Sequence, residues 1–556
     1  MTALIRTQDR RTLFTNVVTV TLLLLCLPLV AVSQSSTVAT TNSRLRSNNN
    51  NNNNHNQDDT SWERIPLLRR LYGNHSVSVR NEIAAMEERM ERYQTGLPGD
   101  PNHLVPYENH PYDKTTTSRR RHLQAGNNAT DQDLFEPIRI SFYTEALDSI
   151  RDGINDAKID WYEKVILPET AEFWTRALAV VPVAGALKMS ATELDNGQFC
   201  GGSSFTKVPS EHVNNGVLDT DLLLYVSGSN DARYCPERTL AVAVPCNFDQ
   251  FDRPTAGAIN VCLDNIILDE SGDASPGVVE DYIDVTIHEI AHVLGHSSNS
   301  YRFFWDPSTG EPRTPRPFQS RTVTCVNGAE RTLILPADNT MKFVNDNGRR
   351  YASIVTEKVR AIARNQFDCQ SLDGAQLENQ PTREESCTGD HWDERLYYPE
   401  ALSGIISPTA NIISSLTLAL MEDSGWYRAN YTVTKMSPWG LGQGCEFAKD
   451  PCLIPDSGGG APSIPEYSRG FFCNEENEKG CSAELTHKLS CTVHDYSYFV
   501  GQSLPPPEFQ YFSNAAKGGP RQADYCPVYG SAYNSQPIEK LDCRNPSNGG
   551  SLNVYR

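Results

Sequence analysis

Residues 282–296 read YIDVTIHEIAHVLGH and decide the fold, because they predict a buried helix that carries two histidines and a glutamate. Across residues 278–294 the apolar side chains recur at the spacing of a helix with one face in a core. His288 and His292 are one turn apart, so both imidazoles leave the same face of that helix. Gly295 then allows the helix to end in a left-handed turn. We therefore expect a buried helix that offers a pair of imidazoles to one shared ligand.

The pair His288 and His292, with Glu289 next to the first, suits a zinc site. Imidazoles on one helix face can share a tetrahedral Zn²⁺ at roughly 2.0–2.1 Å per bond. Glu289 points to the neighbouring side, where a carboxylate can take a proton from metal-bound water and pass it to a leaving amine. We expect one catalytic zinc ion, with Glu289 as general base and then general acid.

A third protein ligand is needed, and the residues alone leave its identity open. The pattern HExxHxxGxxH would place it at position 298, which is Ser298. His296 would lie about 12 Å along a continuing helix from the first histidine, so we expect it to support the site or lie on the surface. Two distant candidates remain: Glu357, on a helix predicted at 353–367, and His391.

The first 33 residues have the order of a secretory signal peptide. Three basic residues, Arg6, Arg10 and Arg11, precede an apolar stretch at 17–32 that is short for a transmembrane helix. An uncleaved signal anchor is the alternative. We expect residues 1–33 to direct the chain into the secretory pathway, and so to the exterior or the cell surface.

Cysteine usage and glycosylation motifs agree with that route. Of 15 cysteines, Cys26 lies in the signal, which leaves an even number between Cys200 and Cys543 for up to seven disulfides. Three sequons fit a glycoprotein, at Asn74, Asn128 and Asn430.

The composition is that of a soluble globular protein, with 38% hydrophobic and 21% charged residues in a chain of 556. A net charge of −20 would repel nucleic acids and anionic membranes at long range, so we expect no nucleic-acid partner. The length predicts several folded units.

Residues 34–122 look like a disordered, inhibitory propeptide. Its first part, residues 34–60, has too few apolar side chains to offset the entropy lost on ordering. The region ends in the basic run Arg119–Arg121, which looks like a processing site, although a solvated charged turn is an alternative. It contains no cysteine, so no thiolate from it can cap the metal in a latent zymogen.

From residue 123 the sequence predicts an α+β catalytic unit that is split by a large insertion. Residues 145–182 look mainly helical, and strands are expected at 137–143, 221–226, 240–244 and 256–263. We expect an N-terminal catalytic subdomain at 123–296, then an insertion and a lower subdomain with His391 at 297–444. Residues 445–556 hold seven cysteines and predict a loop-rich domain stapled by disulfides.

The helix motif and a second motif together resemble one family. HEIAHVLG at 288–295, followed by the insertion and then GDHWDERLYYPEAL at 389–402, resembles the leishmanolysin family of metzincin peptidases. Further segments match that family in texture and order, namely PIRISFYTEAL (137–147), DTDLLLYV (219–226), GAINVC (257–262), TLALMEDSGWY (417–427), MSPWGLGQGC (436–445) and DYCP (524–527). The resemblance covers roughly residues 135–530.

The resemblance implies a zinc endopeptidase that hydrolyses internal bonds of proteins or peptides. His288, His292 and His391 would be the zinc ligands, and Glu289 the catalytic base. By analogy with metzincins, a twisted sheet would lie above the active-site helix. Its strand at 256–261 would form the upper rim of the cleft, where substrate adds as an extended strand.

Two features depart from the family pattern. Leu402 occupies the place of a methionine that lies in a turn beneath the metal, a swap that should cost less than about 1.5 kcal/mol. It raises the alternative of an inactive member that acts as a cell-surface adhesion module, although Glu289 is retained. The sequence stops at 551–556 without the hydrophobic tail of a lipid-anchor signal, which leaves release, peripheral association or an incomplete sequence.

Overall fold

The computed structural model describes residues 102–114, 134–203, 205–230, 235, 239–346, 348–380, 386–405, 407, 409, 411–498, 503–532 and 540–548. All of them belong to one compact unit, Asp59–Arg556. The predicted signal at 1–33, most of the propeptide region at 34–122, the basic run at 119–121 and the sequons at Asn74 and Asn128 lie outside the described residues. Within the described part, no helix combines the length and the apolar character that crossing a membrane would need.

Four strands form the sheet that carries the predicted helix, in the order β2 (Ile140–Tyr143), β6 (Leu222–Ser227), β8 (Pro254–Val261) and β7 (Ala241–Phe248). The first three strands are parallel, and β7 runs antiparallel to β8 at one edge. The strands predicted at these four places are therefore confirmed within a few residues. The chain has a mixed α/β fold with several smaller sheets besides this one.

Both faces of β6 are covered, which explains the unbroken apolar run in its sequence. Leu222 and Leu224 share a core with Trp174 of α7 (Leu167–Ala177) and with Ile290 of the predicted helix. Leu223 and Tyr225 point to the opposite face, where they belong to a second apolar cluster with residues of the 183–217 region. The sheet is thus the middle layer between the helices and that loop-rich region.

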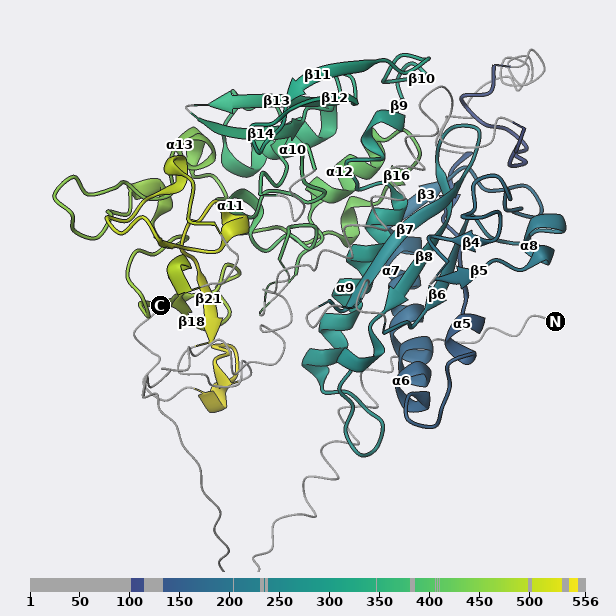
Figure 1. The fold of residues 1–556 in the computed structure, drawn as a ribbon, viewed down its shortest axis with the longest axis horizontal. Coiled ribbons are helices and arrows are strands. Elements are labelled where there is room, and N and C mark those ends of the chain that lie inside the picture. Colours follow the sequence, from purple (N-terminus) through teal and green to yellow (C-terminus); the bar gives the residue numbers. More distant parts are fainter. Residues whose placement is uncertain are drawn as a thin grey trace, which may run out of the picture. The chain divides into compact units, whose positions relative to one another are not determined.

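The predicted helix is α9 (Pro276–Leu294), which packs along β7 and β8 and against α7 (Figure 1). Pro276 occupies its first turn, and the side chain of Ser275 caps it by accepting a hydrogen bond from the N–H of Val278. At the other end Gly295 has φ = 125°, and a Cβ there would lie 2.7 Å from the ring of Trp426. Only glycine fits both the backbone angle and the space, so the helix ends where the sequence predicts.

The insertion after α9 forms hairpins and a helix. Strands β11 (Ser320–Thr324) and β12 (Glu330–Ile334) form one hairpin, and β13 (Met341–Asp346) and β14 (Arg349–Ile354) form another, with β15 (Ala375–Gln376) beside β14. The helix predicted at residues 353–367 is present as α10 (Glu357–Phe367), which packs on α12 (Ser415–Asp423). The insertion is therefore folded, and its helix α10 packs on the part of the chain that follows His391.

Other elements are short: α5 (Glu145–Asp148), α6 (Asp156–Trp161), the π-helical turn Tyr162–Ile166, α8 (Ser210–Asn214), α11 (Glu394–Tyr397), α13 (Gly444–Lys449), β1 (Glu136–Pro137), β3 (Leu178–Val180), β4 (Phe199–Cys200), β5 (Thr206–Lys207), β9 (Trp305–Asp306), β10 (Glu311–Pro312), β16 (Arg428–Ala429), β17 (Lys479–Cys481), β18 (Lys488–Cys491), β19 (His494–Asp495), β20 (Lys517–Gly518) and β21 (Tyr529–Ala532). Residues 145–182 are thus helical only as far as Ala177, after which β3 pairs with β1 and β16.

The cysteine-rich region after α13 has little regular structure besides the small sheet β17-β18-β21. The described residues form six disulfides, Cys200–Cys246, Cys235–Cys262, Cys325–Cys387, Cys369–Cys445, Cys452–Cys526 and Cys473–Cys491. Cys481 and Cys543 remain unpaired, so the full set of seven is not formed. Cys481 faces Lys488 in the ladder of β17 and β18, and the N–H of Cys543 donates to the carbonyl of Thr486.

Candidate metal centre

Three histidines converge at the C-terminal half of α9. His288 and His292 come from the helix, and His391 comes from the segment just before α11. One nitrogen of each ring lies within 4.8 Å of one nitrogen of the other two. The ring centroids are 4.7 Å apart for the helix pair and 5.2 Å apart for each pair that includes His391. The structure thus brings together the two helix histidines and the distant candidate.

Each of these rings uses its Nδ1 in a hydrogen bond that fixes its orientation. Nδ1 of His288 donates to the carbonyl oxygen of Ala401 at 2.5 Å, and Nδ1 of His292 donates to that of His296 at 2.6 Å. Nδ1 of His391 lies 2.9 Å from a carboxylate oxygen of Glu378. Because carbonyl and carboxylate oxygens accept, the proton of each neutral ring sits on Nδ1 and leaves Nε2 as a bare lone pair.

The donor set fits a zinc ion. Nε2 of His288 and Nε2 of His292 lie 3.0 Å apart, and both are unprotonated when their Nδ1 atoms donate. Two lone pairs this close repel unless a cation lies between them, and ligands on one tetrahedral zinc ion are about 3.4 Å apart. Three imidazoles with a carboxylate or carbonyl behind each are typical of a catalytic zinc site with one open position.

Burial keeps the helix pair neutral. It lowers the pKa of His288 well below its ordinary value and that of His292 to about 4, with the neighbouring histidines acting in the same direction. For His391, burial also lowers the pKa, but the carboxylate of Glu378 outweighs it and the net shift is upward. A cation among the rings competes with that proton, because metal ligands must be deprotonated.

Glu289 lies beside the three rings with its carboxylate against the edge strand of the sheet. Burial raises its pKa to about 8, while nearby His391 and a hydrogen bond from the N–H of Ala243 act in the opposite direction. Ala243 belongs to β7, which pairs only with β8 among the described strands. The edge next to the candidate base is therefore β7.

This position of β7 corrects the expectation that residues 256–261 form the rim. That stretch is β8, which is fully buried and pairs with β6 on one side and β7 on the other. Its backbone groups are already used in both ladders, so it cannot accept an added strand. That expectation rested on the analogy with metzincins, whereas the apolar character of β8 marks a central strand rather than an edge.

The residues considered for the third ligand besides His391 have other partners. The carboxylate of Glu357 accepts from Nη2 of Arg313 at 2.8 Å and is outside the histidine group. The N–H of Ser298 donates to the carboxylate of Asp390 at 2.6 Å, which ties the chain after α9 to the residue before His391. His296 is buried, and its carbonyl oxygen orients the ring of His292. Of the two places expected for His296, it therefore has the supporting one and does not lie on the surface.

The sequence did not reveal Glu378. It lies in a polar stretch without a motif, and its role depends on a close approach between two backbones. The N–H of Glu378 donates to the carbonyl of His391 at 2.8 Å, and Gly389 donates back to the carbonyl of Glu378 at 3.1 Å. A Cβ on Gly389 would lie 2.7 Å from Cβ of Glu378, so the glycine of the GDHW motif permits this approach.

Leu402, which stands where the resemblance implies a methionine, lies in a turn that contacts the histidine segment. Leu402 is fully buried, and its carbonyl oxygen accepts from the N–H of Trp392 at 2.8 Å. The adjacent Ala401 holds His288, as described above. The turn thus contacts His288 through Ala401 and Trp392 through Leu402. The side chain of Leu402 is buried in the core.

Comparison with known proteins finds similarity to one family of peptidases. The family model described as Leishmanolysin (Peptidase_M8) matches residues 146–552. A leishmanolysin-like peptidase of Drosophila pseudoobscura pseudoobscura is 30% identical over 370 residues, which cover 57% of this chain and 51% of that protein. A leishmanolysin-like peptidase of Caenorhabditis briggsae is 29% identical over 497 residues, covering 76% and 69%. Leishmanolysin of Leishmania tropica is 27% identical over 382 residues, covering 68% and 48%.

The match spans about half the length of several of these relatives. The match to the family model includes α9, the insertion, the segment around His391 and the cysteine-rich region. Since the family model covers well over half of the sequence, this chain belongs to the leishmanolysin family.

Proposed function

We propose that the chain is a zinc metalloendopeptidase that hydrolyses internal peptide bonds of proteins or peptides. The observation that carries this proposal is the convergence of one nitrogen from each of three histidine rings, with the carboxylate of Glu289 close to His391. A chain of the leishmanolysin family is a metallopeptidase by its family, and zinc suits an all-histidine donor set.

His288, His292 and His391 would hold the ion through Nε2, each oriented from behind by its Nδ1 partner. When bound, zinc polarises the scissile carbonyl and acidifies a water molecule. Glu289 would take the proton of the attacking water and return it to the leaving amine. Its high pKa in the metal-free site falls when a cation is present, so it is ionised for the first of these transfers.

The free edge of β7 supports substrate binding as an added extended strand. Its residues Ala241–Phe248 pair with β8 on one side and with no other described strand. The opposite edge is open to a peptide except where the N–H of Ala243 bonds Glu289 and that of Phe248 bonds Glu193. Together with α9 below it, this edge strand supports a metzincin-like arrangement of the catalytic unit.

Six disulfides support the proposal that the protein is secreted or exposed at the cell surface, because such bonds persist in oxidising compartments. The predicted signal at 1–33 would provide the route, and the basic run at 119–121 a site of zymogen processing. Peripheral or anchored membrane association is an alternative to free release. Leu402 fits the core of the turn, so it lends no support to an inactive adhesion module.

The first test measures hydrolysis of casein by the purified protein with and without 1,10-phenanthroline, alongside the variant Glu289→Ala. We expect chelation to abolish activity and the variant to lose about 10²–10⁴-fold in rate while keeping its zinc. Activity that survives either treatment contradicts the proposal.

The second test assigns the third ligand by elemental analysis of zinc. His391→Ala is expected to lose the metal, whereas Glu357→Ala is expected to keep it, since Glu357 is bound to Arg313. Loss of zinc from the Glu357 variant alone would contradict the ligand assignment.

A further inference from the structure

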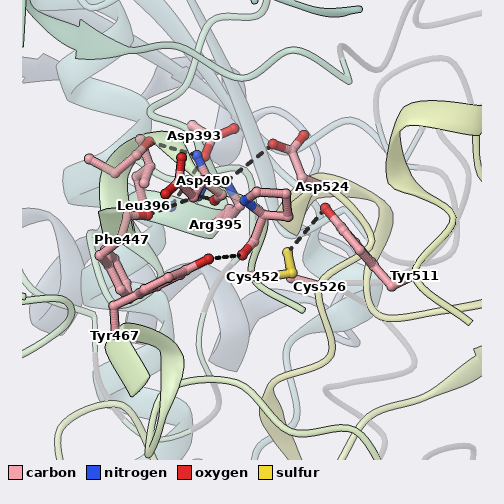
Figure 2. Close-up of a disulfide and its surroundings, with 12 residues drawn as sticks. Asp393, Arg395, Leu396, Phe447, Asp450, Cys452, Tyr467, Tyr511, Asp524 and Cys526 are labelled. Carbon is pink, nitrogen blue, oxygen red and sulfur yellow. Dashed lines mark hydrogen bonds and ion pairs between the residues drawn. A yellow bond between two sulfur atoms is a disulfide. The ribbon is translucent and has the colours of Figure 1, made fainter. Parts of the chain in front are cut away.

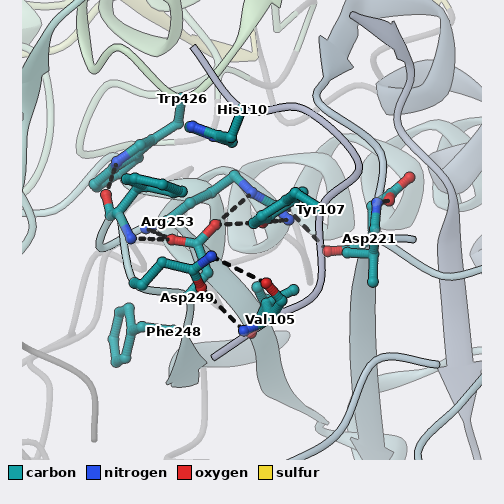
Figure 3. A network of polar contacts seen from close by, with 12 residues as sticks. Val105, Tyr107, His110, Asp221, Phe248, Asp249, Arg253 and Trp426 are labelled. Atoms are coloured by element: carbon teal, nitrogen blue, oxygen red, sulfur yellow. Dashed lines mark hydrogen bonds and ion pairs between the residues drawn. The ribbon is translucent and has the colours of Figure 1, made fainter. Parts of the chain in front are cut away.

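Residues 102–114, which we name the docked segment, lie against the catalytic unit although they fall in the expected disordered propeptide. The side chain of Gln250 bonds both backbone groups of Val105, accepting from its N–H at 2.9 Å and donating to its carbonyl at 3.0 Å. The N–H of Ala184 donates to the carbonyl of Pro106 at 2.8 Å. The backbone of the segment is thus held at Val105, whose hydrogen bonds Figure 3 draws, and at Pro106.

The hydroxyl of Tyr107 completes a charged network in the turn between β7 and β8 (Figure 3). It donates to the carboxylate of Asp249 and accepts from Nη2 of Arg253 at 3.1 Å. Both charged residues are only 3% exposed, and Arg253 also donates to the carbonyl of Asp221 at 3.1 Å. A buried ion pair needs its remaining hydrogen bonds satisfied, and the docked segment supplies two of them, one to each partner.

Two aromatic rings of the docked segment stack on rings of the unit. His110 lies parallel to Phe251 with centroids 3.7 Å apart, and Tyr112 lies parallel to Trp305 at 5.1 Å. Burial lowers the pKa of His110 to about 3, so this ring is neutral and stacks as an apolar group. The hydroxyl of Tyr112 donates to the carbonyl of Gly425 at 2.5 Å.

These contacts reach the end of α9 through one tryptophan. Nε1 of Trp426 donates to the carbonyl of Phe251 at 2.9 Å, and the ring of Trp426 packs over Gly295, which ends the helix. The aromatic side chains of the docked segment contact Phe251, whose carbonyl accepts from Trp426, and Gly425, which precedes Trp426 in the chain. The segment therefore packs against residues that lie behind the end of α9.

We propose that the docked segment is a permanent component of the folded catalytic unit. The surface formed by Gln250, Phe251, Arg253, Trp305 and Gly425 binds it, and it stays bound as a separate peptide when the chain is cut between residues 114 and 134. While the chain is intact the tether gives a high effective concentration, so only a cut chain reveals the affinity of the contacts themselves. This inference stands apart from the peptidase activity.

The experiment uses the full chain with Arg119–Arg121 replaced by the recognition sequence of a site-specific protease, in a Glu289→Ala background that suppresses self-cleavage. After complete cutting, size-exclusion chromatography in native buffer is followed by intact mass measurement of the eluted protein. We expect the N-terminal fragment to elute with the catalytic unit in a one-to-one ratio. A fragment that separates in native buffer overturns the proposal.

A double variant, Tyr107→Phe with Tyr112→Ala, assigns the retention to this surface. We expect it to retain at least about tenfold less fragment, since it lacks the network hydroxyl and the stacked ring. Leu104→Ala is the matched control, because Leu104 lies in the same segment and is 68% exposed. If the double variant does not fold before cutting, Tyr107→Phe alone is compared. Equal retention by wild type and every variant overturns the assigned surface.

Discussion

Single residues set the orientation of the candidate metal centre. Of the three Nδ1 partners, two are main-chain carbonyls that no side-chain substitution can remove, whereas Glu378 is a side chain. It is 3% exposed and holds His391 through both its carboxylate and its backbone. His391 is therefore the ligand candidate whose support can be tested by mutation.

We expect Glu378→Ala to weaken zinc binding by about 10–100-fold, because the ring of His391 loses its orientation and its basicity. Glu378→Gln should lose less, since an amide oxygen still accepts from Nδ1. Titration of the apoprotein against a chromogenic chelator measures the affinity, and circular dichroism checks folding. Glu357→Gln is the control with unchanged affinity, and wild-type affinity in the Ala variant would count against the role of Glu378.

Gly295 also acts at this scale, because its angle and its contact with Trp426 end α9. We expect Gly295→Ala to lower the free energy of unfolding by more than the roughly 1–3 kcal/mol of backbone strain alone. Gly442→Ala isolates that strain, since Gly442 has φ = 71° with no atom within 4 Å of an added Cβ. Chemical denaturation of both variants gives the difference. Equal losses would mean that the tryptophan ring yields without cost.

At the scale of elements, the turn beneath the histidines is joined to α12 by a buried acid. Glu400 is 2% exposed, and its carboxylate accepts from the hydroxyl of Thr417 at 2.5 Å. That hydroxyl in turn accepts from Nε1 of Trp392 at 3.0 Å, next to His391. Burial raises the pKa of Glu400 from 4.5 to about 7.

This shift predicts the sign of a pH dependence. Between pH 4.5 and 7 the folded protein keeps the proton of Glu400 and the unfolded chain has lost it. The stabilising contribution of the protonated Glu400 is therefore complete below pH 4.5, the pKa of Glu400 in the unfolded chain. It is lost as the pH rises through about 7, its pKa in the folded protein. Relative to Glu400→Gln, the wild type should lose up to about 3 kcal/mol over this range.

Urea denaturation at several pH values measures that difference, with excess chelator in every sample so that metal binding does not contribute. Parallel pH profiles of the two proteins would contradict the assignment of this titration to Glu400.

At the scale of the whole unit, the segment of His391 is anchored by the cysteine-rich region. Arg395 of α11 is 1% exposed and donates to the carbonyls of Phe447 and Ala448 at 3.1 and 3.0 Å. It also pairs with Asp524 at 3.3 Å, beside the Cys452–Cys526 disulfide (Figure 2). Residues of α13 and of the region after it thus hold the segment of the third histidine candidate in place, although they supply no ligand candidate to the histidine cluster.

We expect Arg395→Met to lower the free energy of unfolding by about 3–5 kcal/mol, because the buried Asp524 is left without its cation. Arg469→Met is the matched control, since its ion pair with Glu466 is exposed and should contribute less than about 1 kcal/mol. Guanidinium denaturation compares the two. A similar small loss in both would mean that Arg395 does not anchor the region.

Much of the catalytic half could be predicted because its information is local. The spacing in HEIAHVLG predicts α9, and the apolar runs predict the strands, as the structure confirms. The order of the strands could not be predicted, because pairing of β7 and β8 depends on long-range contacts. The assignments of ligands, base and domain boundaries remain predictions, although the histidines lie together as the resemblance implies.

The rest could not be predicted because it depends on partners far along the chain. Glu378 becomes important only where Gly389 lets two backbones meet. Tyr107 and Tyr112 lie in a polar, proline-containing stretch that looks unstructured, since the surface that buries them is formed by residues after position 248. Composition measures what a segment can bury by itself, so it misses a segment that uses another part of the chain.

Because the three histidines come from two different parts of the unit, a bound metal ion would also join those parts. α9 belongs to the sheet-bearing half, and His391 belongs to the half that the insertion and the cysteine-rich region support. A bound zinc ion would be a removable cross-link between these halves, comparable in effect to a disulfide that a chelator can open. Stripping the metal should therefore lower the midpoint of thermal unfolding and speed up trypsin digestion, even in the Glu289→Ala variant that performs no catalysis.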